Sequence, residues 1–328
     1  MRKLIPLALA LLTTTLHAQS PRDTVDGHIA AAKAAAGSDH VGLFNRLCMP
    51  EPTRPAAATT ARGNTQARPA TPPAPPDPSR WAAEPAQVFD NLLFVGEKEY
   101  SAWAVTTSEG IIILDTIFEY SVDRQIAGGL MKLGKDPKTI KYAIVSHGHR
   151  DHSGGALYLQ DKFNTRVILS SADWDMLARN TRDPAKPRRD IEATDGQRLT
   201  LGDTTLTLYI TPGHTPGTIS TLIPVTDNGV KHLAAAWGGT AFNFQHTLQN
   251  FDTYIASARR FRDIVAKAGA DVIISNHTQF DSSPAKLAAL KTRRPGERHP
   301  YVIGTEAVQR YLTVAEECAL ASRLRLQP

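Results

Sequence analysis

The chain has 328 residues, of which 41% are hydrophobic and 21% are charged, and this composition excludes a disordered or fibrous protein. The formal net charge is +5, but the basic residues are spread thinly apart from small clusters such as Arg188-Arg189 and Arg293-Arg294. A nucleic-acid-binding surface needs a basic patch or stripe, so none is expected, and we predict a globular protein.

The N-terminus predicts an exported protein. Arg2 and Lys3 are basic, residues 4–12 are apolar, and small residues precede a cleavage site expected after Ala18. This order is typical of a signal peptide, here residues 1–18. The apolar run is too short to cross a bilayer, so we expect no stable membrane insertion and a periplasmic or secreted location.

Three segments follow the predicted signal peptide. Residues 19–49 are predicted to be an N-terminal helical segment, because residues 29–36 are rich in alanine. Within this segment, residues 41–47 are predicted to form an apolar anchor that packs on the main domain. Residues 50–80 are rich in proline and alanine and predict an extended linker. The main domain is then expected over residues 81–328.

The chain contains two cysteines, Cys48 and Cys318. In an oxidising compartment they could form a disulfide that ties the N-terminal segment to the last helix. Two free, buried thiols are the alternative, and the sequence favours neither.

The main domain alternates groups of predicted strands with predicted helices. Apolar, β-branched runs between turn residues predict strands at 87–89, 92–95, 101–105, 110–115, 142–145, 166–170, 205–210, 218–223, 232–236 and 272–275. Helical spacing of apolar residues predicts helices at 121–133, 153–159, 172–179, 251–268, 287–293 and 306–324. Strands followed by helices, twice over, are typical of two sheets packed between helices.

The densest polar motif follows the strand predicted at 142–145. His147, His149, Asp151 and His152 lie within six positions, and the chain has only 11 histidines, so an accidental cluster is disfavoured. Histidine and carboxylate together suit zinc or a similar divalent metal. Four such groups exceed what one metal takes from one loop. We therefore predict two metals, with the first two histidines facing one and the remaining pair facing the other.

Two later histidines are predicted to complete the coordination. His214 lies in the turn 211–217, which two prolines and two glycines make rigid. His277 follows the strand predicted at 272–275. The alternatives are a turn that tolerates a histidine and a capping histidine, but the first motif favours metal ligands at both places.

The pattern His-x-His-x-Asp-His after an apolar strand resembles the signature of the metallo-β-lactamase superfamily, over roughly residues 81–291. The resemblance implies an α/β (α+β) fold, the αββα sandwich, in which two mixed β-sheets are flanked by helices. It also implies two Zn²⁺ ions. It assigns His147, His149 and His214 to the first ion, and Asp151, His152 and His277 to the second.

The resemblance also implies roles in catalysis. A hydroxide shared by the two ions would attack the substrate carbonyl, and Asp151 would orient it and relay its proton. Neutral histidine ligands need fixed tautomers, and Asp115 at an earlier strand end is a candidate acceptor.

The strand region 232–241 narrows the resemblance further. Several members of the superfamily carry an aspartate there that bridges both metals, whereas this chain has neither a carboxylate nor a cysteine in that stretch. The remaining ligand set resembles the third subclass of class B β-lactamases. That subclass usually has a serine-containing segment that holds the substrate carboxylate, and here Gly238, Gly239 and Thr240 replace it. We predict that the Thr240 hydroxyl contacts the substrate.

The sequence therefore predicts an exported dinuclear zinc hydrolase that opens the β-lactam amide with a zinc-bound hydroxide. A hydrolase of another small ester, lactone or amide on the same fold is the main alternative. A zinc-binding protein without catalysis is a third hypothesis, disfavoured because all six ligands are present.

Overall fold

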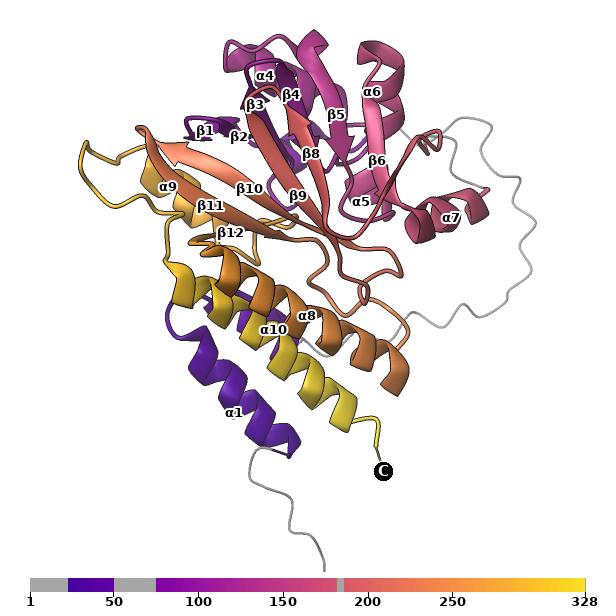
Figure 1. Ribbon diagram of the computed structural model, residues 1–328, viewed down its shortest axis with the longest axis vertical. Coiled ribbons are helices and arrows are strands. Elements are labelled where there is room, and N and C mark those ends of the chain that lie inside the picture. Colours follow the sequence, from indigo (N-terminus) through magenta and orange to yellow (C-terminus); the bar gives the residue numbers. More distant parts are fainter. Residues whose placement is uncertain (1–22, 50–74, 182–185, 328) are drawn as a thin grey trace, which may run out of the picture.

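The structure is a computed structural model that describes residues 23–49, 75–181 and 186–327 (Figure 1). The predicted signal peptide and most of the predicted linker lie outside these residues. In the part of the chain that the structure describes, no helix is long and apolar enough to cross a membrane.

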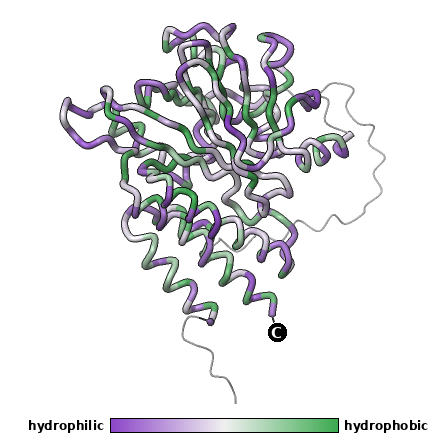
Figure 2. Tube along the Cα trace, in the orientation of Figure 1, coloured by the Kyte–Doolittle hydropathy of each residue, from purple (hydrophilic) through white to green (hydrophobic). Residues whose placement is uncertain are grey.

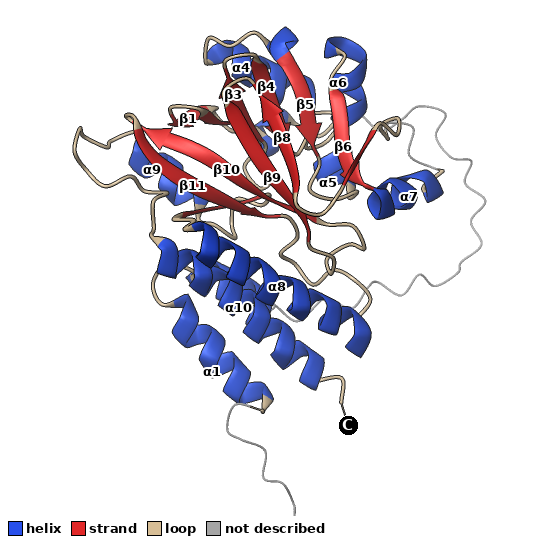
Figure 3. Ribbon diagram, viewed as in Figure 1, coloured by secondary structure: helices blue, strands red, loops and turns tan. Residues whose placement is uncertain are grey.

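Two mixed β-sheets lie at the centre of the molecule (Figure 3). The first sheet contains, in spatial order, β1 (Ala86–Phe89), β2 (Leu92–Phe94), β3 (Trp103–Thr107), β4 (Gly110–Leu114), β5 (Ile140–Ile144), β6 (Arg166–Ser170) and β7 (Ile191–Ala193). The second contains β12 (Val272–Ser275), β11 (Val230–Trp237), β10 (Ile219–Asp227), β9 (Thr204–Ile210) and β8 (Gln197–Leu201). Strands β4 to β7 pair in parallel, as do β11 and β12, and the other neighbours are antiparallel.

Helices cover the outer face of each sheet (Figure 1). The first sheet is accompanied by η1 (Asp123–Ala127), α4 (Gly128–Lys132), η2 (Pro137–Thr139), α5 (Arg150–Ser153), α6 (Ala156–Phe163) and α7 (Ser171–Arg179). The second is covered by α1 (Val25–Ala36), α2 (Val41–Cys48), α8 (Leu248–Ala268) and α10 (Thr305–Leu324). The short helix α3 (Pro78–Trp81) precedes β1, and α9 (Ser283–Leu290) packs near β1. The predicted αββα sandwich of two mixed sheets between helices is confirmed.

Three hydrophobic clusters hold the four layers together. One cluster lies between the first sheet and its helices and includes Ala143 and Leu159. A second lies between the two sheets and includes Ile144 and Leu208. The third lies between the second sheet and its helices and includes Trp237 and Phe261. Hydrophobic and hydrophilic residues alternate around the turns of the helices that cover the second sheet (Figure 2). Each of these helices therefore buries one face and exposes the other.

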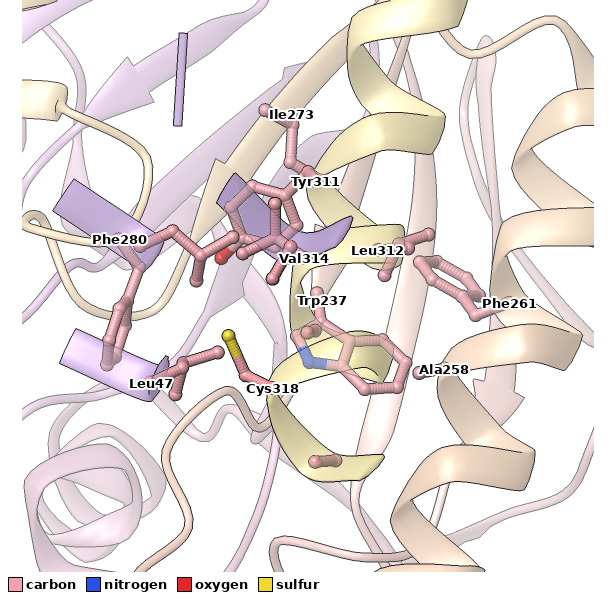
Figure 4. Packing of buried hydrophobic residues seen from close by; sticks show 14 of the residues in the cluster. Leu47, Trp237, Ala258, Phe261, Ile273, Phe280, Tyr311, Leu312, Val314 and Cys318 are labelled. Atoms are coloured by element: carbon pink, nitrogen blue, oxygen red, sulfur yellow. The ribbon is translucent and has the colours of Figure 1, made fainter. Parts of the chain in front are cut away.

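The N-terminal helices α1 and α2 belong to the outer layer over the second sheet. Both pack against α10, and Leu43, Leu47 and Cys48 enter the same cluster as Trp237 (Figure 4). Cys48 and Cys318 form a disulfide across 270 residues, which decides between the two alternatives that the sequence left open. The segment expected as an apolar anchor is thus a helix covalently fixed to the C-terminal helix.

We expect that replacing both cysteines by serine lowers the free energy of unfolding by about 5 kcal/mol, because the disulfide closes a very long loop in the unfolded chain. Urea unfolding of the oxidised protein and the double variant would measure the difference. An unchanged midpoint would contradict the prediction.

Some elements of the structure differ from the sequence prediction, among them α9 and β8. The helix predicted at 287–293 is wrong in register, since α9 spans Ser283–Leu290. Pro284 fits the first turn of α9, where its missing N–H is not needed. The helix therefore begins near this proline, and not at Leu287, where the spacing of apolar residues had placed its start. Strand β8 was not predicted because its polar residues alternate with Leu199 and Leu201 at a half-exposed edge of the sheet.

Candidate metal centre

The six predicted ligands come from loops that follow three strands. The loop after β5, together with α5, supplies four side chains, the turn between β9 and β10 supplies His214, and the loop after β12 supplies His277. The four from the first loop are His147, His149, Asp151 and His152. The backbone N–H of Ile219 donates to the carbonyl of Ser146 at 2.7 Å and joins the first two loops across the sheets.

The structure brings these six side chains together in the two groups that the resemblance implied. One group is His147, His149 and His214, and the other is Asp151, His152 and His277; in each, the candidate ligand atoms lie within 4.8 Å of one another. In the first group, Nε2 of His214 is 3.0 Å from Nε2 of His147 and 3.1 Å from Nδ1 of His149. The three nitrogens therefore point at a common centre.

Hydrogen bonds fix the tautomers of two of these histidines. Nδ1 of His147 faces the Gly238 carbonyl at 2.9 Å, and Nδ1 of His214 faces the Ala241 carbonyl at 2.7 Å. A carbonyl oxygen only accepts, so each Nδ1 carries the proton and each Nε2 presents a lone pair. Two lone pairs 3.0 Å apart repel each other unless a cation lies between them. The arrangement therefore fits a metal ion.

In the second group, two imidazole nitrogens also lie close together, and a carboxylate oxygen joins them. Nε2 of His152 lies 3.2 Å from Nε2 of His277 and 3.2 Å from Oδ2 of Asp151. Asp151 Oδ2 is also 3.6 Å from Nε2 of His277. Two imidazole nitrogens and one carboxylate oxygen, with no thiolate, form a donor set that suits zinc.

Asp115 fixes the tautomer of His152, as the sequence suggested. Its Oδ2 accepts from Nδ1 of His152 at 3.0 Å, and its Oδ1 accepts from the backbone N–H of Ser146 at 2.6 Å. Asp115 follows β4 with a φ of 60°, a left-handed conformation that costs free energy for a non-glycine residue. This backbone turn places one carboxylate between the ligand loop and the buried imidazole.

Burial keeps most of the histidines neutral. It holds the pKa of His147 well below its ordinary value and lowers the pKa of His214 and of His277 to about 3. For His152 burial also lowers the pKa, but Asp151 and Asp115 outweigh it and raise the pKa to about 10. The first group is thus ready to bind a metal at pH 7, whereas the second carries a proton that a metal must displace.

We expect the second Zn²⁺ to release about one proton more per chain at pH 7 than the first, in addition to any proton lost from metal-bound water. The affinity of the second group should then rise about tenfold per pH unit until the pH reaches the pKa of His152, about 10. Calorimetric titration of metal-free protein in two buffers of different ionisation enthalpy would measure the protons released. Equal enthalpies in both buffers for both binding events would refute this expectation.

Asp173 on α7 connects two ligand loops and was missed by the sequence analysis. Its Oδ2 accepts from the Gly148 N–H at 2.9 Å and from the Thr215 hydroxyl at 2.7 Å, and its Oδ1 accepts from the Gly217 N–H at 2.8 Å. The side chain is fully buried. One carboxylate therefore holds the loop of His147 against the turn of His214, and no local motif marks it in the sequence.

The glycine pair after β11 supports the centre through its backbone. The Gly238 carbonyl accepts from Nδ1 of His147 and from Nδ2 of Asn276. A Cβ at Gly239 would lie 2.4 Å from Cβ of His214. A side chain at Gly239 therefore does not fit, and this strand end cannot supply a bridging carboxylate in the present backbone.

The structure does not support the substrate-binding role expected for Thr240. The residue is 1% exposed, and its hydroxyl lies 3.4 Å from the Tyr311 hydroxyl in the core. Its carbonyl accepts from the Tyr254 hydroxyl, which holds the segment against α8. The hydroxyl faces α10 rather than a substrate, so Thr240 is a packing residue.

Comparison with known proteins supports the family that the motif indicated. The model of the Metallo-beta-lactamase superfamily matches residues 95–227, a range that holds every candidate ligand except His277. The crystal structure of BJP-1, a subclass B3 metallo-beta-lactamase of Bradyrhizobium japonicum, aligns with a TM-score of 0.62 and 26% identity over 72% of this chain and 92% of that one. The Rm3 metallo-beta-lactamase aligns with a TM-score of 0.64 and 26% identity over 74% and 95%. The chain belongs to the metallo-β-lactamase superfamily.

Curated relatives found by sequence similarity to this metallo-β-lactamase-fold chain are described as other hydrolases, not as β-lactamases. A probable metallo-hydrolase, YybB, of Bacillus subtilis (strain 168) is 30% identical over 122 residues, which are 35% of this chain and 52% of that protein. An N-acyl homoserine lactonase of Bacillus sp is 29% identical over 151 residues, 44% and 58% of the two chains. The chain thus spans about half the length of the curated relatives it matches, and these matches leave its substrate open.

Proposed function

We propose that this chain is a binuclear zinc hydrolase that opens the amide bond of β-lactam rings. The observation that carries the proposal is that six candidate ligands meet in two adjacent groups, with facing lone pairs in the first group and no room for a bridging carboxylate at Gly239. The solved structures of the Bradyrhizobium protein and of Rm3, both described as metallo-beta-lactamases, support the choice of substrate class.

His147, His149 and His214 would hold the first ion, and Asp151, His152 and His277 the second. When bound, the ions supply Lewis acidity to a substrate carbonyl and to a water molecule. The side chain of Asp151 is 23% exposed. Its carboxylate would accept a hydrogen bond from the attacking water and would relay the proton that this water loses. Asp115 and the Gly238 and Ala241 carbonyls keep His152, His147 and His214, respectively, in the tautomers that the triads need.

Hydrolysis of a lactone is the second candidate, because several curated relatives at 27–29% identity are N-acyl homoserine lactonases. The segment after β11 weighs against it. Lactonases in the superfamily carry a bridging aspartate in this region, whereas here a Cβ at Gly239 would meet His214.

We also propose that the chain is exported. The Cys48–Cys318 disulfide is typical of an oxidising compartment, and residues 1–18 have the composition of a signal peptide.

Turnover of a penicillin, a cephalosporin, a carbapenem and an N-acyl homoserine lactone by the zinc-loaded protein, with and without a chelator, tests the proposal. Chelator-sensitive hydrolysis of β-lactams with little lactone turnover is the expected result. Hydrolysis of the lactone alone would favour the second candidate, and a zinc-bound protein inert toward all four would refute both.

A further inference from the structure

Helix α2 lies directly against the loop that carries His277. A Cβ at Gly42 would come within 3.0 Å of the Gln279 carbonyl, so the helix backbone touches this loop. Leu47 and Phe280 belong to one buried cluster and lie near each other in Figure 4. The ring of Phe280 is in turn 5.6 Å from the ring of His277. The N-terminal segment therefore packs directly against the loop that carries His277.

The position of α2 is fixed at both ends. Before its first residue, Nε2 of His40 lies 2.7 Å from the Ala307 carbonyl at the start of α10. At its last residue, the disulfide joins Cys48 to Cys318 in α10. A side chain on the exposed face of α2 is therefore presented at a defined place beside the metal centre.

Arg46 occupies that exposed face, one residue before Leu47. Within residues 23–49, 75–181 and 186–327, no hydrogen bond or ion pair engages its guanidinium group. Burial is the main cause that lowers the pKa of His277, and the positive charge of Arg46 lies close enough to lower it further. His277 and Asp151 keep 18% and 23% of their side chains exposed. The triad is thus partly open to solvent.

We propose that Arg46 binds the carboxylate of an anionic substrate at the mouth of the metal centre. A guanidinium group matches a carboxylate with two parallel hydrogen bonds, and an unpaired one needs no existing ion pair to be broken. Thr240, which the sequence suggested for this task, is buried against Tyr311. The inference rests on the proposed function and refines it, since a neutral lactone would gain nothing from Arg46.

Kinetics on a matched pair of substrates test this role. Benzylpenicillin carries the carboxylate, and its methyl ester lacks the charge. For zinc-loaded full-length protein, we expect Arg46→Ala to raise KM for benzylpenicillin about tenfold, with kcat little changed and the ester unaffected, since a charge-assisted hydrogen bond contributes about this much. Arg46→Lys should restore part of the loss. Arg198→Ala, which removes an exposed arginine from β8, is the control. Equal effects on acid and ester, or none, would overturn the proposal.

A binding measurement separates this inference from the proposed function. Calorimetry would give the Kd of hydrolysed benzylpenicillin for zinc-loaded wild type and Arg46→Ala, whether or not either turns over a β-lactam. A roughly tenfold weaker Kd in the variant supports the carboxylate site even if hydrolysis fails. An equal Kd, or no binding by the wild type, overturns it.

Discussion

His214→Ala is expected to abolish hydrolysis and to remove one of two zinc ions. The substitution deletes one of three nitrogens that converge on the first centre, so the remaining pair, His147 and His149, would hold an ion only weakly. The loss of turnover should be about 1,000-fold or more, equivalent to several kcal/mol of transition-state stabilisation. Metal content by mass spectrometry and initial rates with a β-lactam would measure both effects.

The matched control is His246→Ala. His246 is exposed, and its ring nitrogen faces the Phe242 carbonyl rather than a triad. Activity and metal content should stay at wild-type values in this variant. Full activity in His214→Ala would contradict the assignment of the first triad.

Asp173→Ala is expected to damage both stability and catalysis. It leaves the buried N–H groups of Gly148 and Gly217 and the Thr215 hydroxyl without their acceptor. Each buried donor left unpaired costs about 1–3 kcal/mol, so a total loss of about 3–5 kcal/mol is expected. The two ligand loops should also lose their relative position, and the affinity for the first zinc should fall about 10- to 100-fold.

Thermal unfolding and zinc titration of the Asp173→Ala variant check these two effects. Asp175→Ala is the matched control, because Asp175 lies on the same helix but makes an exposed ion pair with Arg189. If Asp173→Ala bound zinc as tightly as the wild type, its carboxylate would not position the ligands.

The two groups of candidate metal ligands could be predicted because each residue follows an apolar strand within a short, recognisable motif. The strands end at one side of the sandwich, and the three loops meet there. Asp115 was found for the same reason, since it directly follows β4. Local sequence and the ligand needs of a divalent metal were sufficient for these residues.

Residues whose role depends on contacts between distant segments were missed or misjudged. Asp173 lies 25 residues from Gly148 and 42 from Thr215, and nothing in its neighbours announces those hydrogen bonds. Thr240 was given a role from its place after β11, but the turn directs its hydroxyl toward Tyr311. The carboxylate-binding role proposed for Arg46 follows only from the packing of α2 beside Phe280, which the sequence does not show.

The most direct test of the two-metal centre is anomalous diffraction at the zinc edge from crystals of the full-length protein grown with Zn²⁺. The account predicts two zinc peaks, one among His147, His149 and His214 and the other among Asp151, His152 and His277. Crystals that contain zinc elsewhere but show no peak within these two groups would contradict it.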